Sequence, residues 1–268
     1  FVVSALHAPA FVEYAIFGTT GVQHPRTSWS HIGNFELPAF DADEQSKIAD
    51  LLWQVHNAIV ANDVAHTATM DLKRAAMGTL FTRGLRGEAQ KETEIGPVPE
   101  SWDPAAVGCF AAVKGGKRMP KGVSLTKENT GKPYIRVTDF QDHGVAVDQV
   151  LFVPRGYEGL INRYIISCKD VYVSIAGTIG LVGQVPKCLE GANLTENAAK
   201  ICITNSHVAA RFAMYALASD ACQLQIAQAT GKNAQPKLAL VRIEQVKIPL
   251  PQTLEEQHEI VAILDTID

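Results

Sequence analysis

The chain has 268 residues, 47% of them hydrophobic and 19% charged, a composition typical of a globular protein with one large domain or two modest ones. It contains no run of the roughly 18 apolar residues that a membrane-spanning helix needs, so no membrane association is expected. Five cysteines without a Cys-x-x-Cys pair argue against a disulfide framework or a structural zinc site. Unpaired thiols in a reducing, cytoplasmic environment are expected instead.

The formal net charge of −4 hides an uneven distribution. Residues 103–250 contain 17 lysines and arginines against 11 aspartates and glutamates, whereas the rest of the chain contains 7 against 17. Such an asymmetry is expected when one part of a protein contacts phosphate and another part contacts protein. Chance scatter of surface charge is the alternative.

A diverged internal repeat runs through the chain with a period of about 200 residues. Each copy has Phe-x-x-Tyr-Ala, then a polar segment with glycine and proline, then Leu-Pro followed by Glu-Gln-x-x-Ile. The first copy occupies 11–15, 21–26 and 37–52, and the second occupies 212–216, 231–237 and 250–264. Three anchors in the same order indicate a duplicated domain followed by a connector.

A long helix is predicted in the first copy. Asp41, with Glu44 three residues later, forms a capping-box pattern that marks its start. Apolar residues recur at helical spacing from Ile48 until Gly84 ends the pattern. About 40 residues span roughly 60 Å in a helix, too long for one small domain to cover the apolar stripe, so a coiled-coil partner helix is expected. A similar helix starts at Glu255 and would be its antiparallel partner.

The region between these helices has a mixed pattern. Residues 86–102 are rich in Glu, Gly and Pro and read as a linker. Alternating apolar residues then predict strands at 134–138, 145–152, 170–175, 181–185 and 200–203, and a helix at 207–229. The expected fold class is α+β, a globular mixed α/β domain combined with long coiled-coil-forming helices.

No catalytic motif is present. The sequence lacks Asn/Asp-Pro-Pro-Tyr, a glycine-rich loop for S-adenosylmethionine, a phosphate-binding loop, His-Glu-x-x-His and Gly-x-Ser-x-Gly. The eight histidines show no metal-ligand spacing. We therefore expect no catalytic residue, metal or cofactor in this chain. A nuclease centre built from Asp139, Asp142, Glu158 and Lys169 is the alternative, although such loose spacing is common in proteins.

The first candidate for nucleic-acid contact is a basic cluster around Gly115-Gly116. It consists of Lys114, Lys117, Arg118 and Lys121, with no acidic residue inside it. Loops of this kind lie along phosphates, where each neutralised phosphate releases a condensed counterion. An ordinary solvated loop is the alternative.

The second candidate is a strand that begins after Gly131. Its period of two places Tyr134, Arg136 and Thr138 on one face. Tyrosine and arginine side chains can stack on bases or contact base edges and phosphates. Alternatively, Tyr134 belongs to the core and Arg136 pairs with Asp139.

Two loops complete the set. Ser174 and Thr178 lie in a glycine-containing loop that can approach an anion closely, although a tight hairpin is the commoner meaning. The segment 231–237 carries cations and amides that can pair with adenine, and its polar residues are Lys232, Asn233, Gln235 and Lys237. The first repeat has an equivalent polar segment at 23–26, which suggests two similar reading surfaces.

Taken in order, these motifs resemble the specificity subunit of a bacterial type I restriction–modification system. The resemblance rests on the repeated Leu-Pro…Glu-Gln-x-x-Ile entry and on the segments 80–87, 95–102, 134–139, 170–180 and 231–250. It covers essentially the whole chain, and the ordered set is more specific than any single motif.

The resemblance implies a division of the chain into four parts. Residues 1–36 would be the tail of a first target recognition domain, 37–102 a central conserved region, 103–249 a second target recognition domain, and 250–268 the start of a distal conserved helix. Most of the first recognition domain and of the second helix lies outside this sequence, so the chain is expected to read at most one half of a bipartite target.

The resemblance also implies the partners. They would be double-stranded DNA, modification (methyltransferase) subunits that bind S-adenosylmethionine, and restriction subunits that use ATP and Mg²⁺. The long helix could also pair with a second copy of the chain. A stand-alone nuclease or methyltransferase fragment and an assembly scaffold that does not bind DNA remain the alternatives.

Overall fold

The computed structural model describes residues 1–21, 24–141, 143–231 and 236–267. The chain forms two compact units, 1–70 and 71–268, here called the N-terminal and C-terminal units. The boundary falls inside one helix, α4 (Ala42–Arg83). The four-part division implied by the resemblance therefore stays a prediction.

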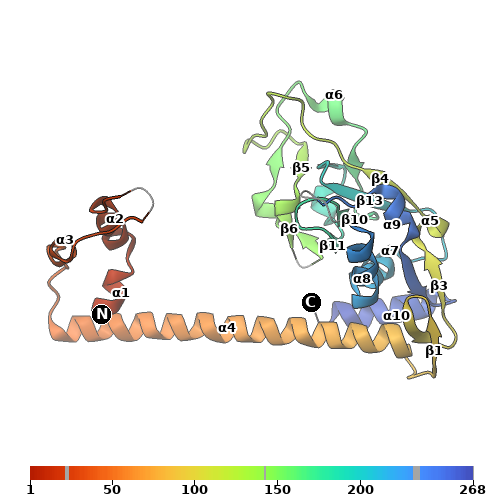
Figure 1. Ribbon diagram of the computed structural model, residues 1–268, viewed down its shortest axis with the longest axis horizontal. Coiled ribbons are helices and arrows are strands. Elements are labelled where there is room, and N and C mark those ends of the chain that lie inside the picture. The colour runs from red at the N-terminus through yellow and green to blue at the C-terminus, as the bar shows by residue number, and fades with distance from the viewer. Residues whose placement is uncertain (22–23, 142, 232–235, 268) are drawn as a thin grey trace. The chain divides into compact units, whose positions relative to one another are not determined.

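The N-terminal unit contains α1 (Val2–Leu6), α2 (Pro9–Phe17), α3 (Trp29–Gly33) and the first part of α4 (Figure 1). None of the described residues in α1, α2 and α3 is buried. Helices α2 and α3 are joined by Tyr14, whose hydroxyl donates to the His31 carbonyl at 2.9 Å while the two rings stack 4.2 Å apart. Gly18 permits this contact, because a Cβ there would lie 2.0 Å from the His31 ring.

The start and end predicted for the long helix are confirmed. The Asp41 carboxylate accepts a hydrogen bond from the Glu44 backbone N–H at 2.8 Å, which caps α4 at its N-terminus. The helix ends where Gly84 adopts a φ of +62°, a left-handed conformation that favours glycine. Many apolar side chains on α4 are exposed, among them Leu51, Trp53, Val55, Ile59, Val64 and Leu72.

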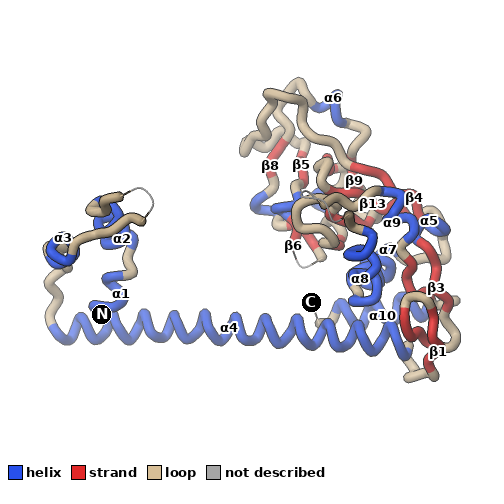
Figure 2. The backbone as a smooth tube through the Cα atoms, viewed as in Figure 1, coloured by secondary structure: helices blue, strands red, loops and turns tan. Residues whose placement is uncertain are grey.

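The C-terminal unit is built around two four-stranded sheets (Figure 2). One is antiparallel in the order β11-β10-β13-β4, with strands β4 (Ala111–Gly115), β10 (Val171–Ser174), β11 (Val182–Gly183) and β13 (Ala198–Ile203). The other is mixed in the order β8-β5-β12-β9, with strands β5 (Pro133–Ile135), β8 (Leu151–Phe152), β9 (Ile165–Ile166) and β12 (Ala192–Leu194).

Three two-stranded ladders and several short helices complete the unit. The ladders pair β1 (Gln90–Thr93) with β2 (Gly96–Pro99), β3 (Asp103–Ala106) with β14 (Lys247–Leu250), and β6 (Phe140–Gln141) with β7 (Gly144–Val145). The helices are α5 (Val107–Phe110), α6 (Glu158–Ile161), α7 (Ala210–Ala218), α8 (Asp220–Ala229), α9 (Leu240–Gln245) and α10 (Leu254–Asp265). Short 3₁₀ turns lie at η1 (Val137–Asp139), η2 (Val147–Gln149) and η3 (Lys187–Leu189).

The main core surrounds α7, whose residues from Phe212 to Leu217 are all at most 1% exposed. Side chains of β10, of α10 and of the end of α4 belong to the same cluster, so α7 is enclosed on several sides. Phe81 and Trp102 each contact the Phe212 ring, with ring centroids 5.7 and 6.1 Å away. Burial of each such aromatic side chain contributes roughly 1.5–3 kcal/mol to folding. The Trp102 indole N–H donates to Glu256 at 3.2 Å and links the segment after β2 to α10.

Two smaller cores lie beneath the second sheet and its neighbours. One includes Ile135, Ile166, Tyr172 and Leu194, and the other joins Met119, Tyr134, Val153 and Ile161. Both clusters draw residues from segments far apart in the sequence. They therefore hold the loops between the strands in fixed positions.

The pairing of β3 with β14 brings the two ends of the segment 103–250 together. Asp103 is in register with Leu250, and Ala106 with Lys247. The chain then enters α10, where the Thr253 hydroxyl accepts from the Glu256 backbone N–H at 3.3 Å. The helix predicted to start at Glu255 is thus confirmed, one residue earlier, at Leu254.

Four of the predicted segments differ from the structure. Residues 86–102, expected as a linker, contain the antiparallel pair of β1 and β2. The stretch 145–152, expected as one strand, is β7 and β8 separated by the turn η2. The stretch 207–229, expected as one helix, is α7 and α8, with the chain turning at Ser219 because its backbone is extended (φ −65°, ψ 152°). The expected strand 134–138 ends at Ile135. By contrast, the repeated Phe-x-x-Tyr-Ala motif is helical in both copies, in α2 and α7.

Candidate functional site

The ends of three strands meet at one edge of the antiparallel sheet. The Gly116 N–H donates to the Ala198 carbonyl at 3.0 Å, and the Ile175 N–H donates to the Asn197 carbonyl at 2.7 Å. The Leu238 N–H in turn donates to the Ile175 carbonyl at 2.9 Å. Segments 116–118, 175–178, 195–198 and 237–238 therefore lie side by side, and we call them the loop edge. Three strand spacings of about 4.8 Å give it a width of roughly 14 Å.

The basic cluster predicted from the sequence lies at and beside this edge. Lys114 is exposed on β4 and sits directly opposite Lys200 of β13. Lys117 is exposed, and its ammonium nitrogen lies 5.8 Å from the centre of the Tyr164 ring. Lys121 is exposed two residues after the buried Met119, which anchors this loop to the protein. The backbone is thus held in place while three cations reach solvent.

Arg118 differs from its neighbours because the fold brings an acid to it. Its guanidinium is ion-paired with Glu196, with Nε and Oε1 2.5 Å apart. The hydrogen bond and the charge of Glu196 raise the pKa of Arg118. Burial of Glu196 is the largest single effect and raises its pKa, but the hydrogen bonds from Arg118, its own backbone N–H and Thr195, together with the charge of Arg118, lower the pKa overall. The cluster contains no acid in sequence, yet one of its four cations is already neutralised.

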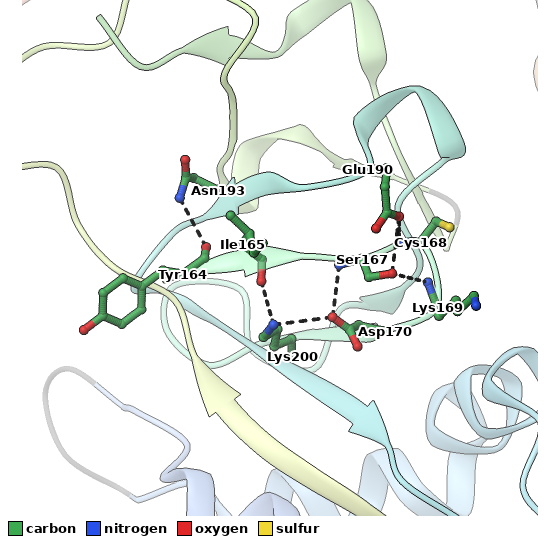
Figure 3. Close-up of polar contacts among 9 residues, drawn as sticks. All are labelled: Tyr164, Ile165, Ser167, Cys168, Lys169, Asp170, Glu190, Asn193 and Lys200. Carbon is green, nitrogen blue, oxygen red and sulfur yellow. Dashed lines mark hydrogen bonds and ion pairs between the residues drawn. The ribbon is translucent and has the colours of Figure 1, made fainter. Parts of the chain in front are cut away.

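Lys200 is likewise committed to contacts within the protein, as Figure 3 shows. Its ammonium donates to the Ile165 carbonyl at 2.6 Å and lies 3.5 Å from the Asp170 carboxylate. The same carboxylate accepts from the Ser167 N–H at 3.0 Å. Only 15% of the Lys200 side chain is exposed. Lys114, its exposed neighbour across the ladder, is therefore the cation of this pair that faces solvent.

The strand face predicted from Tyr134, Arg136 and Thr138 does not form. Tyr134 is a core residue, 4% exposed, and its hydroxyl donates to the Lys117 carbonyl at 2.7 Å. Arg136 donates to the Asp139 carboxylate from Nε, from Nη2 and from its own backbone N–H, and the chain turns into η1 at this point. Thr138 is exposed on that turn. The alternative reading, core tyrosine and paired arginine, describes the structure.

The Ser174 loop is a tight hairpin. The Ser174 hydroxyl donates to the Thr178 carbonyl at 2.6 Å and accepts from the Leu181 N–H at 2.8 Å. Gly177 and Gly180 have φ values of +76° and +92°, which side-chain-bearing residues rarely adopt. Ser174 is thus buried and structural, whereas Thr178 is exposed at the tip, within the loop edge.

The last predicted segment reaches the same place through Lys237. This exposed residue forms an isolated antiparallel bridge with Ala176, next to the Thr178 tip. Lys232, Asn233 and Gln235 lie outside the described residues. In the first repeat, Arg26 forms a corresponding isolated bridge, with Thr20.

Two of the residues considered for a nuclease centre, Asp139 and Glu158, make other contacts, and Lys169 is exposed. Asp139 is held by Arg136, and Glu158 accepts from the Gly156 N–H at 2.7 Å. Asp142 lies outside the described residues. Within the described ranges, no group of three or more His, Cys, Asp or Glu side chains is placed to hold a metal ion. None of the described helices is both long and apolar enough to cross a membrane.

Sequence reasoning missed several residues of this region. Glu196 and Asn197 lie in a polar turn between β12 and β13, and only the fold places them beside Arg118 and Ile175. A polar Thr-Glu-Asn turn between two apolar strands was the available signal. It indicates a turn, but not what the turn faces.

Comparison with known proteins gives a consistent picture. Residues 99–268 match the family model described as "Type I restriction modification DNA specificity domain". The chain is 24% identical over 256 residues to the type I restriction enzyme MjaVIII specificity subunit of Methanocaldococcus jannaschii. The alignment covers 93% of this chain and 59% of that protein. It is 25% identical over 173 residues to the EcoBI specificity subunit of Escherichia coli, covering 61% of this chain and 34% of that one.

Solved structures share the fold. The S subunit of a type I restriction–modification system from M. genitalium superposes with a TM-score of 0.59 at 16% identity, covering 93% of this chain and 62% of that one. The HsdS subunit from Thermoanaerobacter tengcongensis gives a TM-score of 0.51 at 18% identity, covering 96% and 59%. The chain therefore spans less than two thirds of the length of these relatives.

Proposed function

The chain belongs to the type I restriction modification DNA specificity domain family, and from this premise we propose that it is a DNA-recognition subunit that directs partner enzymes to a target sequence. The observation that carries the proposal is the loop edge. Lys117 and Lys237, 120 positions apart in the sequence, extend from the two outer segments of this edge, and Lys114 and Lys121 flank Lys117 in the sequence. Exposed cations on rigidly held backbone are suited to neutralising phosphates while neighbouring polar groups approach the bases.

The chain itself supplies binding and no turnover. Methylation would be carried out by modification subunits with S-adenosylmethionine, and cleavage by restriction subunits with ATP and Mg²⁺. The exposed apolar side chains of α4 would be covered by a second helix, either the continuation of α10 or the α4 of a second copy. Such an assembly would act in the cytoplasm, where chromosomal and incoming DNA meet.

The decisive experiment is selection of bound sequences from random duplex DNA, using the chain assembled with its modification subunit. A recognition subunit is expected to enrich a half-site of a few base pairs, with an affinity that falls steeply as salt rises. Failure to enrich any sequence would overturn the proposal.

Two simple assays distinguish DNA recognition from two alternative functions. A stand-alone nuclease or methyltransferase would modify DNA when the purified chain is supplied with Mg²⁺ or S-adenosylmethionine at stoichiometric concentration. An assembly scaffold would keep its DNA affinity unchanged when Lys114 and Lys117 are replaced by glutamate. A recognition subunit is expected to show no modification in the first assay and a loss of affinity in the second.

A further inference from the structure

A groove with both apolar and polar lining residues lies at the opposite end of the β10–β11 hairpin from the loop edge. Its volume is about 610 Å³, and it is lined by the β6–β7 hairpin, by the segment after β11 and by Arg211 of α7. The side chains that give it chemical character are Gln141, His143, Gln184 and Lys187. None of them was singled out by the sequence motifs.

The β6–β7 hairpin is held rigidly against the sheet. Phe140 stacks on Tyr172 with ring centroids 3.8 Å apart, and the Tyr172 hydroxyl donates to the Gly144 carbonyl. Nδ1 of His143 lies 2.9 Å from the carbonyl oxygen of Val182. The His143 carbonyl accepts a hydrogen bond from the Gln184 backbone N–H at 2.9 Å. Side chains on this hairpin are therefore preorganised, which reduces the entropy lost when they bind a partner.

His143 carries a backbone conformation that calls for an explanation. Its φ of +61° places it in the left-handed region, and it is the only described residue other than glycine to adopt it. Histidine tolerates this conformation better than most residues, but the cost is still real. Left-handed residues of this kind cluster at binding sites, where the surrounding structure holds them in place. Here both His143 and Gln141 line the groove.

The groove and the exposed cation Lys114 are on one face of the sheet. Tyr172 pairs with Lys200, and Lys200 pairs with Lys114, so these three side chains project from the same side. The β6–β7 hairpin packs over Tyr172 on that side. Four strand residues separate the groove from the loop edge, or roughly 13 Å. A duplex makes one turn in about 34 Å, so this separation is shorter than one turn of a double helix.

The groove has the chemistry of base recognition. Gln141 is exposed, and its side-chain amide makes no hydrogen bond to other described residues. The Gln184 amide has one long contact, 3.5 Å to the Cys168 carbonyl. Each glutamine can offer a donor and an acceptor together, the pairing that adenine presents in the major groove. Lys187 lines the same groove, is exposed, and supplies positive charge for a phosphate.

We propose that this groove is a second DNA-contacting surface, in which Gln141 and Gln184 select bases through paired hydrogen bonds and Lys187 contacts a phosphate. The inference rests on the proposed function, because it names residues that give that function its sequence preference. On this proposal the loop edge supplies affinity for any DNA sequence, and the groove supplies discrimination between sequences.

The test repeats the selection from random duplex DNA with the chain and its modification subunit, using wild type, Gln141→Ala and Gln184→Ala. Each variant is expected to lose roughly 10-fold of the discrimination at one or two base pairs of the selected motif. Gln252→Ala, an exposed glutamine outside the groove, is the matched control and is expected to keep the wild-type motif. Equal far-UV circular dichroism and urea midpoints for all four proteins exclude unfolding as the cause.

The contribution of Lys187 is measured separately, as affinity against salt concentration. Lys187→Ala should weaken binding to all sequences similarly and reduce the slope of log K against log salt by about one. The inference would be overturned if both glutamine variants selected the wild-type motif, or if they lost affinity equally for every sequence. Either result would leave the proposed function standing. Failure of the wild-type protein to select any motif would overturn both.

Discussion

The guanidinium of Arg118 is ion-paired with the carboxylate of Glu196, 78 positions further along the chain, with 2.5 Å between Nε and Oε1. This contact places an anion within the most basic segment of the chain. A phosphate approaching Arg118 has to compete with Glu196. The pair therefore limits the general affinity of the loop edge for any polyanion and leaves more of the binding to sequence-dependent contacts.

Replacing Glu196 by glutamine should increase non-specific affinity for DNA. The substitution frees Arg118, so one further phosphate can be neutralised and the salt slope should steepen by about one. Binding to a random duplex, measured at several salt concentrations, checks this. Glu94→Gln is the matched control, because Glu94 forms an equally short pair with Lys247 outside the loop edge. Unchanged affinity of Glu196→Gln would mean that Arg118 does not face the duplex.

The pH dependence of the same pair has a defined sign. The pKa of Glu196 is lowered in the folded protein, because the effect of burial is outweighed by the combined hydrogen bonds from Arg118, its own backbone N–H and Thr195 and by the charge of Arg118. Its contribution to stability is therefore present above the unfolded pKa and is lost as the pH falls through the folded one. At neutral pH the pair is fully formed, so the Glu196→Gln comparison is made there.

Arg136→Ala should destabilise the C-terminal unit by about 2 kcal/mol, because it removes hydrogen bonds to the buried Asp139 carboxylate. Urea denaturation gives the change in the free energy of unfolding. Arg155→Ala is the control, since its pair with Glu128 is exposed on both sides, and it should cost less than about 1 kcal/mol. Equal stability of the two variants would show that the Arg136 pair is dispensable to the fold.

Gly183→Ala should destabilise the fold by about 1–3 kcal/mol. A Cβ at this position would lie 2.3 Å from the Tyr172 hydroxyl and 2.4 Å from the His143 carbonyl. Gly159→Ala, in α6, is the comparison, because nothing lies within 4 Å of its Cβ position. Thermal unfolding followed by circular dichroism distinguishes them, and a tolerated Gly183→Ala would argue against tight docking of the β6–β7 hairpin.

Cys222 should resist alkylation in the native protein at pH 8, while the exposed Cys109 and Cys188 react. Burial raises the pKa of Cys222 to about 12. The stability linked to this thiol is fully present below its unfolded pKa and is lost as the pH rises towards the folded value. Mass spectrometry after iodoacetamide treatment identifies the modified thiols, and rapid labelling of Cys222 under native conditions would contradict the structure.

Local signals in the sequence predicted both ends of α4 and the start of α10 correctly. Asp41, Gly84 and the stretch around Glu255 act within a turn of their own position, so their effects can be read without the rest of the fold. The same holds for the hairpin around Gly177 and Gly180. These features depend on backbone geometry that neighbouring residues decide.

What the sequence could not predict depends on partners far along the chain. Tyr134 alternates like a surface residue of a strand, but the core formed with Met119, Val153 and Ile161 buries it. The cluster at 114–121 is free of acids in sequence, and its neutralisation by Glu196 arises only when β12 and β13 fold back beside it. The glutamines of the groove carry no motif at all. Their significance comes from a shared cavity.

The pairing of β3 with β14 bears on how the segment between these two strands could be replaced during evolution. Because Asp103 and Leu250 are paired, the chain enters and leaves the segment between them at adjacent points. A replacement segment of different length could join the flanking helices at the same two points if it kept the packing of α7 against Phe81 and Trp102. New target preferences could thus be acquired by swapping one cassette, while the flanking helices retain the surfaces they already have.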